Sequence, residues 1–120
     1  MSTVYETIVT AMGSEVNSFQ DEQMFILFGP QAPDTLRDYC YVIDVNSING
    51  NIAPNQNATI DGQTYRITAV GDLVNKNLEN LGHVTFAFTG DKHAELPGTI
   101  YLENQPLPVL QIGSKIVISA

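Results

Sequence analysis

The 120-residue sequence predicts an all-β domain, a small closed or nearly closed β-barrel of about seven strands with two short helical turns. Short segments rich in Val, Ile, Thr, Tyr and Phe recur along the chain, and turn residues separate them. Helical periodicity is confined to two stretches of about two turns or less. The strand pattern fits a barrel or a sandwich, and the helices that interrupt it argue against a simple meander, so a barrel is favoured.

The first three strands are expected in the N-terminal half of the chain. Residues 3–12 are rich in Thr, Val, Ile and Tyr, which fit a pleated surface. Residues 24–28 are continuously apolar and stop at Gly29-Pro30, which is typical of a strand covered on both faces. Residues 39–45 form another β-rich run.

The C-terminal half shows clearer alternation. Strands are expected at residues 64–70, 83–89, 99–103 and 115–119. The first of these follows Asp61-Gly62, a two-residue signature of a type I′ hairpin turn. In the second, Val84, Phe86 and Phe88 share one face, which predicts that this face is buried.

The two helical pieces have recognisable ends. Asp34 is expected to cap a turn that runs to Asp38, and Asp72 is expected to cap a helix over residues 73–81. Gly82 is expected to end that second helix.

Length and charge limit the classes of function. Residues 1–120 make one domain, because no linker or repeat divides the chain. Thirteen carboxylates against five Lys and Arg give a net charge of −8, which disfavours nucleic acid and anionic lipid as partners. The single cysteine, Cys40, the lack of a signal-like N-terminus and apolar runs too short to span a bilayer predict a cytoplasmic protein without membrane insertion.

Few residues could carry chemistry. No nucleotide-binding loop or metal-ligating cluster occurs, so no cofactor and no metal are expected. Cys40 is interpreted as a small buried hydrophobic residue, because Asp38 and Asp44 nearby give the wrong charge for a reactive thiolate. The acidic stretches 21–22 and 34–38 are interpreted as solvated surface, with docking of a basic partner as the less favoured alternative.

His83 is the best candidate for a reactive group. It follows Gly82 at the mouth of a strand and is expected to point away from the apolar face, with Thr85 beside it. A neutral imidazole is a competent nucleophile near pH 7. The residues alone favour the plainer interpretation, an ordinary half-exposed strand histidine. His93 lies in the polar loop 90–95 and is a weak second candidate, more simply a solvated loop residue.

Several short motifs together resemble a known family. They are Tyr39-Cys40, Thr68-Ala69-Val70-Gly71, Asn77-Leu78, Leu81-Gly82-His83-Val84-Thr85 and Pro97-Gly98-Thr99. Their order and spacing, over nearly the whole chain, resemble the glucitol/sorbitol-specific IIA component of the bacterial phosphoenolpyruvate-dependent sugar phosphotransferase system.

The resemblance implies a small β-barrel and a role as a phosphotransferase component that is not an enzyme on its own. Such a component accepts a phosphoryl group from the histidine-containing phosphocarrier protein on a histidine. It passes the group to the sorbitol-specific IIB component, and the membrane IIB/IIC components take up and phosphorylate glucitol/sorbitol.

One departure from the family concerns the acceptor. Family members of the enterobacterial type have a histidine shortly after the Tyr-Cys pair, and residues 41–45 here contain none. His83 matches the family's Gly-His-Val-Thr motif, so the acceptor role is expected there, supported by Gly82 and Thr85. The phosphoryl oxygens are expected to be stabilised by backbone amides around Gly82 and by the N-terminal end of the helix expected over residues 73–81.

Two other functions remain open at this stage. One is a regulatory or interaction module that keeps the fold and is not phosphorylated, which the missing histidine favours. The other is a small-ligand-binding β-barrel. Against this function, a barrel of so few strands should have an interior that its own side chains fill.

Overall fold

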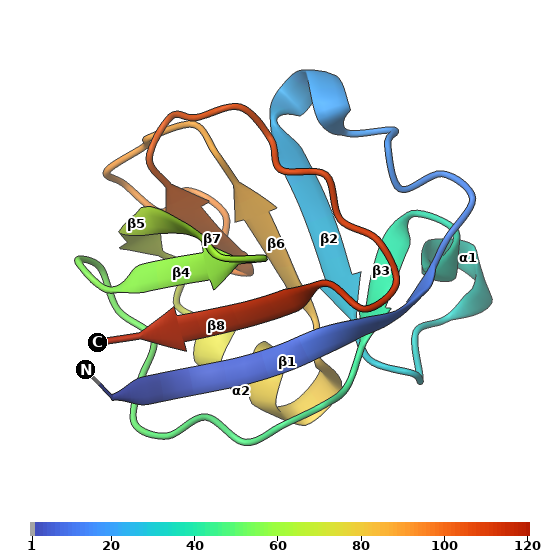
Figure 1. The fold of residues 1–120 in the computed structure, drawn as a ribbon, viewed down its shortest axis with the longest axis horizontal. Helices are drawn as coiled ribbons and strands as arrows, with labels where there is room; N and C mark the ends of the chain where they lie inside the picture. The colour runs from blue at the N-terminus through green and yellow to red at the C-terminus, as the bar shows by residue number, and fades with distance from the viewer. Residues whose placement is uncertain (1) are drawn as a thin grey trace.

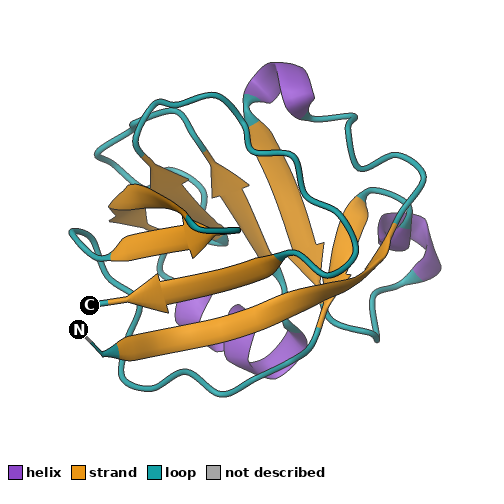
Figure 2. Ribbon diagram, in the orientation of Figure 1, coloured by secondary structure: helices purple, strands orange, loops and turns teal. Residues whose placement is uncertain are grey.

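The computed structural model describes residues 2–120 and shows a mostly β protein (Figure 1). The strands are β1 Thr3–Met12, β2 Met24–Phe28, β3 Cys40–Ile43, β4 Asn57–Ile60, β5 Gln63–Val70, β6 Val84–Ala87, β7 Thr99–Leu102 and β8 Lys115–Ser119. Between them lie the 3₁₀ helix η1 Gln20–Glu22 and the helices α1 Asp34–Arg37 and α2 Val74–Leu81. Figure 2 shows that helices make up little of the chain.

The strands close into a barrel in the order β1-β3-β2-β6-β7-β5-β4-β8, which confirms the predicted fold class. The pairs β2–β3 and β6–β7 are parallel, and the other pairs are antiparallel. The strand β4 adds to the seven expected ones. It precedes the Asp61-Gly62 turn, where both residues have positive φ (49° and 87°), as a type I′ turn requires.

Side chains from all eight strands fill the barrel interior. Phe25 and Phe86 stack there with ring centroids 5.1 Å apart, and Phe88 packs edge-on against Tyr65 at 5.0 Å. Inward-facing residues of β6 are thus the apolar ones that the alternation identified. A barrel filled in this way gives no support to an interior ligand site.

The helix α2 packs Val74 and Leu78 into the same core. The expected caps are wrong: Leu73 and Pro33 occupy the N-cap positions of α2 and α1, and neither makes a side-chain cap hydrogen bond. The Leu73 N–H donates to the Pro97 carbonyl oxygen (2.9 Å), which ties the start of α2 to the segment before β7. Gly82 ends α2 as expected, at φ 70°.

A second, smaller apolar cluster lies outside the barrel wall. It consists of Phe28, Ala32 and Cys40, with Ile26 packed against it. Because side chains of β2 alternate, Phe25 and Leu27 face the interior while Ile26 and Phe28 face this outer cluster. This explains why β2 is apolar throughout. Within residues 2–120, no helix is long and apolar enough to cross a membrane.

Candidate functional site

His83 lies where the chain passes from α2 into β6, on the outer wall of the barrel, and it is half-buried. Gly82 makes this connection possible with its left-handed backbone conformation. The Gly82 N–H donates to the Leu78 carbonyl oxygen (2.9 Å), and the His83 N–H donates to that of Asn77 (3.3 Å). The entry into β6 is therefore fixed by hydrogen bonds to the last turns of α2.

Two contacts from β2 orient the imidazole of His83. Its Nδ1 atom lies 3.3 Å from the carbonyl oxygen of Leu27. Its ring stacks on Phe28, with centroids 4.2 Å apart and planes inclined by 23°. Because a carbonyl oxygen only accepts hydrogen bonds, this contact favours the tautomer with the proton on Nδ1. The lone pair then belongs to Nε2, the nitrogen suited to act as a nucleophile.

The imidazole lines a groove of about 380 Å³ on the outer face of the barrel. The residues that line this outer groove are Phe19, Ile26, Leu36, Tyr39, Cys40, His83 and Thr85. Phe19 and Tyr39 contact each other across it, with ring centroids 6.0 Å apart. Thr85 therefore shares one surface with His83, on the strand face where the sequence placed both.

The surroundings of His83 come from β2 and β3, which sequence reasoning did not connect with it. The antiparallel register pairs Leu27 with Val84 and Ile26 with Thr85, and the parallel register pairs Ile26 with Cys40. The continuous apolar run of β2 indicated that both of its faces are covered. That apolar run did not indicate that His83 is the residue covering one of the two faces of β2.

The expected backbone support for a phosphoryl group at His83 is wrong. The amides of Gly82 and His83 already bond to carbonyl groups of α2. The N-terminus of α2 lies at the other end of an eight-residue helix, about 12 Å away along its axis. The end of α2 that adjoins His83 is its C-terminus, where the helix dipole is negative. Phosphoryl oxygens on His83 need other partners.

Cys40 lies in the wall of the outer groove but is only 1% exposed. Burial raises the pKa of its thiol to about 11. Because the thiolate is the nucleophilic form, Cys40 is not a reactive group near neutral pH.

His93 lies in the β6–β7 loop, exposed to solvent, and it does not line the outer groove. Its carbonyl oxygen accepts a hydrogen bond from the Glu95 N–H (3.2 Å). Among residues 2–120, no group of three or more His, Cys, Asp or Glu side chains is arranged to hold a metal ion.

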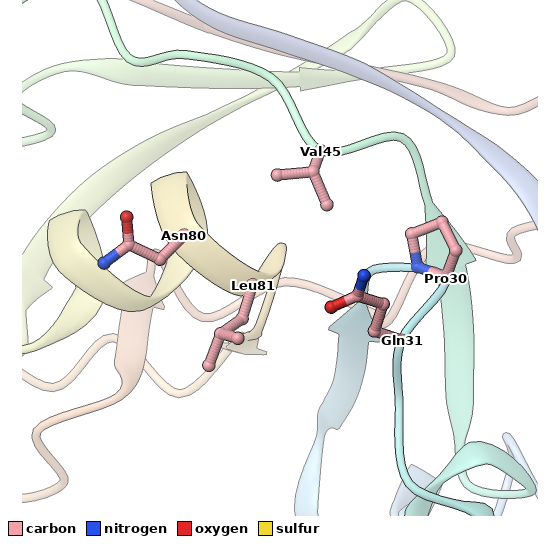
Figure 3. Close-up of a pocket in the computed structure, with 5 residues that line it drawn as sticks. All are labelled: Pro30, Gln31, Val45, Asn80 and Leu81. Atoms are coloured by element: carbon pink, nitrogen blue, oxygen red, sulfur yellow. The ribbon is translucent and has the colours of Figure 1, made fainter.

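The segment that follows Tyr39-Cys40 ends at a second pocket, separate from the outer groove. Ile43 is buried in the barrel core, and Val45 is exposed after β3 ends. This pocket of about 340 Å³ lies beside it. Figure 3 shows Val45 facing Gln31 and Leu81 in this pocket. The pocket is lined by Pro30, Gln31, Val45, Asn80 and Leu81, none of which is a nucleophile.

In the sequence, Gly82 lies between Leu81, which lines this pocket, and His83, which lines the outer groove. A Cβ atom on Gly82 would lie 2.9 Å from the Gly29 nitrogen and 3.2 Å from Cγ2 of Val45. Three segments, the ends of β2, β3 and α2, thus meet closely beside His83.

Comparison with known proteins gives consistent matches over nearly the whole chain. The sequence model of the family described as PTS system glucitol/sorbitol-specific IIA component matches residues 4–117. The glucitol/sorbitol-specific EIIA components of Shigella flexneri and Escherichia coli K12 are each 34% identical over 108 residues, which cover 90% of this chain and 87% of theirs. A crystal structure of a PTS system IIA component from Enterococcus faecalis V583 superimposes with a TM-score of 0.82 at 28% identity. That match covers 97% of this chain and 100% of that one.

Proposed function

Because this chain belongs to the glucitol/sorbitol-specific IIA family of the sugar phosphotransferase system, we propose that it is a phosphoryl carrier with His83 as its acceptor. His83 receives the phosphoryl group from the histidine-containing phosphocarrier protein and passes it to the sorbitol-specific IIB component. A chain that exchanges phosphoryl groups between that carrier and membrane IIB/IIC components is expected to act in the cytoplasm.

One observation carries this proposal: the contact between His83 Nδ1 and the Leu27 carbonyl oxygen, which leaves the lone pair on Nε2. In the transfer, that lone pair attacks the phosphorus of the donor phosphohistidine. The P–N bond of the donor breaks, and its electron pair returns to the donor nitrogen. The proton of His83 stays on Nδ1 throughout, where it remains hydrogen-bonded to the Leu27 carbonyl oxygen.

The outer groove suits a carrier because it gives water little help in attacking a phosphohistidine. None of its lining residues is a carboxylate, and none besides His83 is an imidazole, so a general base for water is lacking among them. The phosphoryl group adds up to about two negative charges to a chain that already carries −8. Thr85 can donate one hydrogen bond to it, and cationic groups of a partner must supply the rest.

The test is the mass of the intact protein after incubation with phosphoenolpyruvate, enzyme I and the histidine-containing phosphocarrier protein. The proposal predicts one acid-labile phosphoryl group, which disappears when the sorbitol-specific IIB component is added. A phosphoryl group that cannot be discharged to the IIB component contradicts the carrier role.

A second candidate is an interaction or regulatory module of the same fold that is not phosphorylated. The pocket at Val45 favours it, because the segment that carries a histidine in enterobacterial-type relatives here ends among residues without a nucleophile. The same assay separates the two functions. This module predicts no added mass under conditions that charge the Escherichia coli relative.

A further inference from the structure

The loop of residues 44–56 joins β3 to β4 and runs beside β1 and α2 (Figure 1). Hydrogen bonds to α2 fix it on both sides of residues 49 and 50. Before them, the Ile48 N–H donates to Oε2 of Glu79 (2.8 Å). After them, the Ile52 N–H donates to Oδ1 of Asn75 (2.7 Å). Because both acceptors belong to α2, this loop forms a strap across the helix.

The middle of the strap holds Asn49-Gly50, the single Asn-Gly pair of the sequence. Both residues are exposed. The Asn49 N–H donates to the Val4 carbonyl oxygen (2.8 Å), but within residues 2–120 neither the Gly50 N–H nor the Asn49 side-chain amide takes part in a hydrogen bond. Gly50 has φ 89°, and a Cβ atom there would meet nothing within 4 Å. The Gly50 nitrogen is therefore free to approach the side chain of Asn49.

We propose that Asn49 is a site of spontaneous deamidation, and that its conversion loosens the strap from α2. The Gly50 nitrogen, once its proton has passed to hydroxide, attacks Cγ of Asn49. The new C–N bond closes a five-membered succinimide, the Cγ–Nδ2 bond breaks, and Nδ2 takes up a proton and leaves as ammonia. Water then opens the succinimide at either of its carbonyl carbons and gives aspartate or isoaspartate.

Other residues with the same chemistry are held in place by hydrogen bonds. Asp61-Gly62 can form the same succinimide, but the Asp61 carboxylate accepts hydrogen bonds from the Ser114 hydroxyl (2.7 Å) and the Lys115 N–H (2.9 Å). The side-chain amide of Asn46, in the same loop as Asn49, donates to the Glu6 carbonyl oxygen (2.8 Å). These two positions serve as internal controls, because each side chain must first break its hydrogen bonds.

The product at position 49 differs from asparagine in its charge and, as isoaspartate, in the length of the backbone. The new carboxylate lies one residue from the N–H that Glu79 holds, and charges separated by less than about 8 Å are poorly screened at physiological salt. Isoaspartate also inserts a methylene group into the backbone between Ile48 and Ile52, the two residues bonded to α2. Both changes act against the hydrogen bond from Ile48 to Glu79.

Deamidation can be measured on the whole chain without any partner protein. The chain is incubated for weeks at neutral and at mildly alkaline pH, then digested at acidic pH, and its peptides are compared by mass spectrometry. An isoaspartyl methyltransferase labels the isoaspartate. We expect an acid in place of the amide at Asn49, formed faster at the higher pH because the attacking nitrogen must lose its proton. Asn46 and Asp61 should show no comparable change.

Two variants test the Asn-Gly pair. Gly50→Ala should slow the conversion of Asn49 by about tenfold or more, because a Cβ atom hinders the approach of the nitrogen. Asn49→Gln should remove the reaction at this position, since the longer side chain would have to close a larger ring. Conversion of Asn49 no faster than that of Asn46, or an equal rate in Gly50→Ala, would overturn the site.

Hydrogen exchange of the Ile48 N–H tests the effect on the strap. Asn49→Asp, which adds the charge at once, should speed this exchange by roughly three- to tenfold. In a Glu79→Gln background the same change should have less than about a twofold effect, because the repelled carboxylate is gone. Equal effects in both backgrounds contradict the repulsion. Unchanged exchange in the aged chain, which also contains isoaspartate, would show that deamidation does not loosen the strap.

Discussion

The imidazole of His83 lies against the ring of Phe28, with centroids 4.2 Å apart and planes inclined by 23°. Phe28 is itself 6% exposed, because the outer cluster with Ala32 and Cys40 covers its other side. The histidine is therefore held on a rigid surface built by β2. This makes Phe28 a positioning residue for the transfer that we propose at Nε2.

Replacing Phe28 tests that positioning role. Phe28→Leu should lower stability by about 1 to 2 kcal/mol and slow phosphorylation by roughly tenfold, because the ring of His83 loses its flat support. The control is Phe88→Leu, a change in the barrel interior with a similar or larger cost in stability. It should leave the phosphorylation rate unchanged. Equal rates for the two variants contradict a role for the stacking.

The tautomer of His83 can be measured without any partner. At about pH 8.5, where free imidazole is neutral, ¹⁵N–¹H correlation spectra should place the ring proton of His83 on Nδ1. After phosphorylation, ³¹P–¹⁵N coupling should place the phosphoryl group on Nε2. The exposed His93 serves as a reference in the same spectra. A proton on Nε2 of His83 contradicts the contact with the Leu27 carbonyl oxygen.

Gly82 is predicted to be sensitive to substitution for two reasons. Its φ of 70° disfavours a side chain, and a Cβ atom would lie 2.9 Å from the Gly29 nitrogen. Gly82→Ala should therefore cost about 2 to 3 kcal/mol in urea denaturation. Gly62→Ala is the control, since Gly62 has φ 87° but open space around it, and should cost about 1 kcal/mol. Equal costs would show that the contact with Gly29 is unimportant.

Alkaline pH should destabilise the protein. Burial raises the pKa of Tyr5 to about 12 and that of Cys40 to about 11, from ordinary values of 10.0 and 9.0. Between the ordinary and the raised value, the unfolded chain loses a proton that the folded chain keeps. The free energy of unfolding should then fall from about pH 9 to pH 12, by up to about 1.4 kcal/mol per pH unit for each group.

Tyr5→Phe separates the contribution of the tyrosine from the rest. Among residues 2–120 its buried hydroxyl has no hydrogen-bond partner, and the nearby Thr7 hydroxyl donates to the Asp44 carbonyl oxygen (2.8 Å). The variant should be as stable as the parent near neutral pH and lose less stability between pH 10 and 12. Tyr39→Phe, at an exposed position, should follow the parent curve. If Tyr5→Phe loses as much stability as the parent between pH 10 and 12, ionisation of Tyr5 is not the cause of that loss.

Local patterns anticipated much of the barrel but little of the site. Alternation in residues 83–89 correctly separated the inward Val84 and Phe86 from the outward His83, because a strand has a two-residue period. The strand β4 was missed since Asn57–Ile60 is short and only partly apolar, although the Asp61-Gly62 turn implied a partner for β5.

The neighbours of His83 could not be derived from the sequence. Leu27 precedes it by 56 residues, and the pairing of β2 with β6 joins them only in the folded chain. The expected amide donors at Gly82 failed for a different reason. A helix that ends at a left-handed glycine uses those same N–H groups to satisfy its own last carbonyls.

The most direct test of the account is which histidine receives the phosphoryl group. His83→Ala and His93→Ala are incubated beside the parent with phosphoenolpyruvate, enzyme I and the histidine-containing phosphocarrier protein, and intact masses are recorded. We predict one acid-labile phosphoryl group on the parent and on His93→Ala, and none on a folded His83→Ala. A label that survives in His83→Ala, or a parent that acquires none while the Escherichia coli relative is charged, would contradict it.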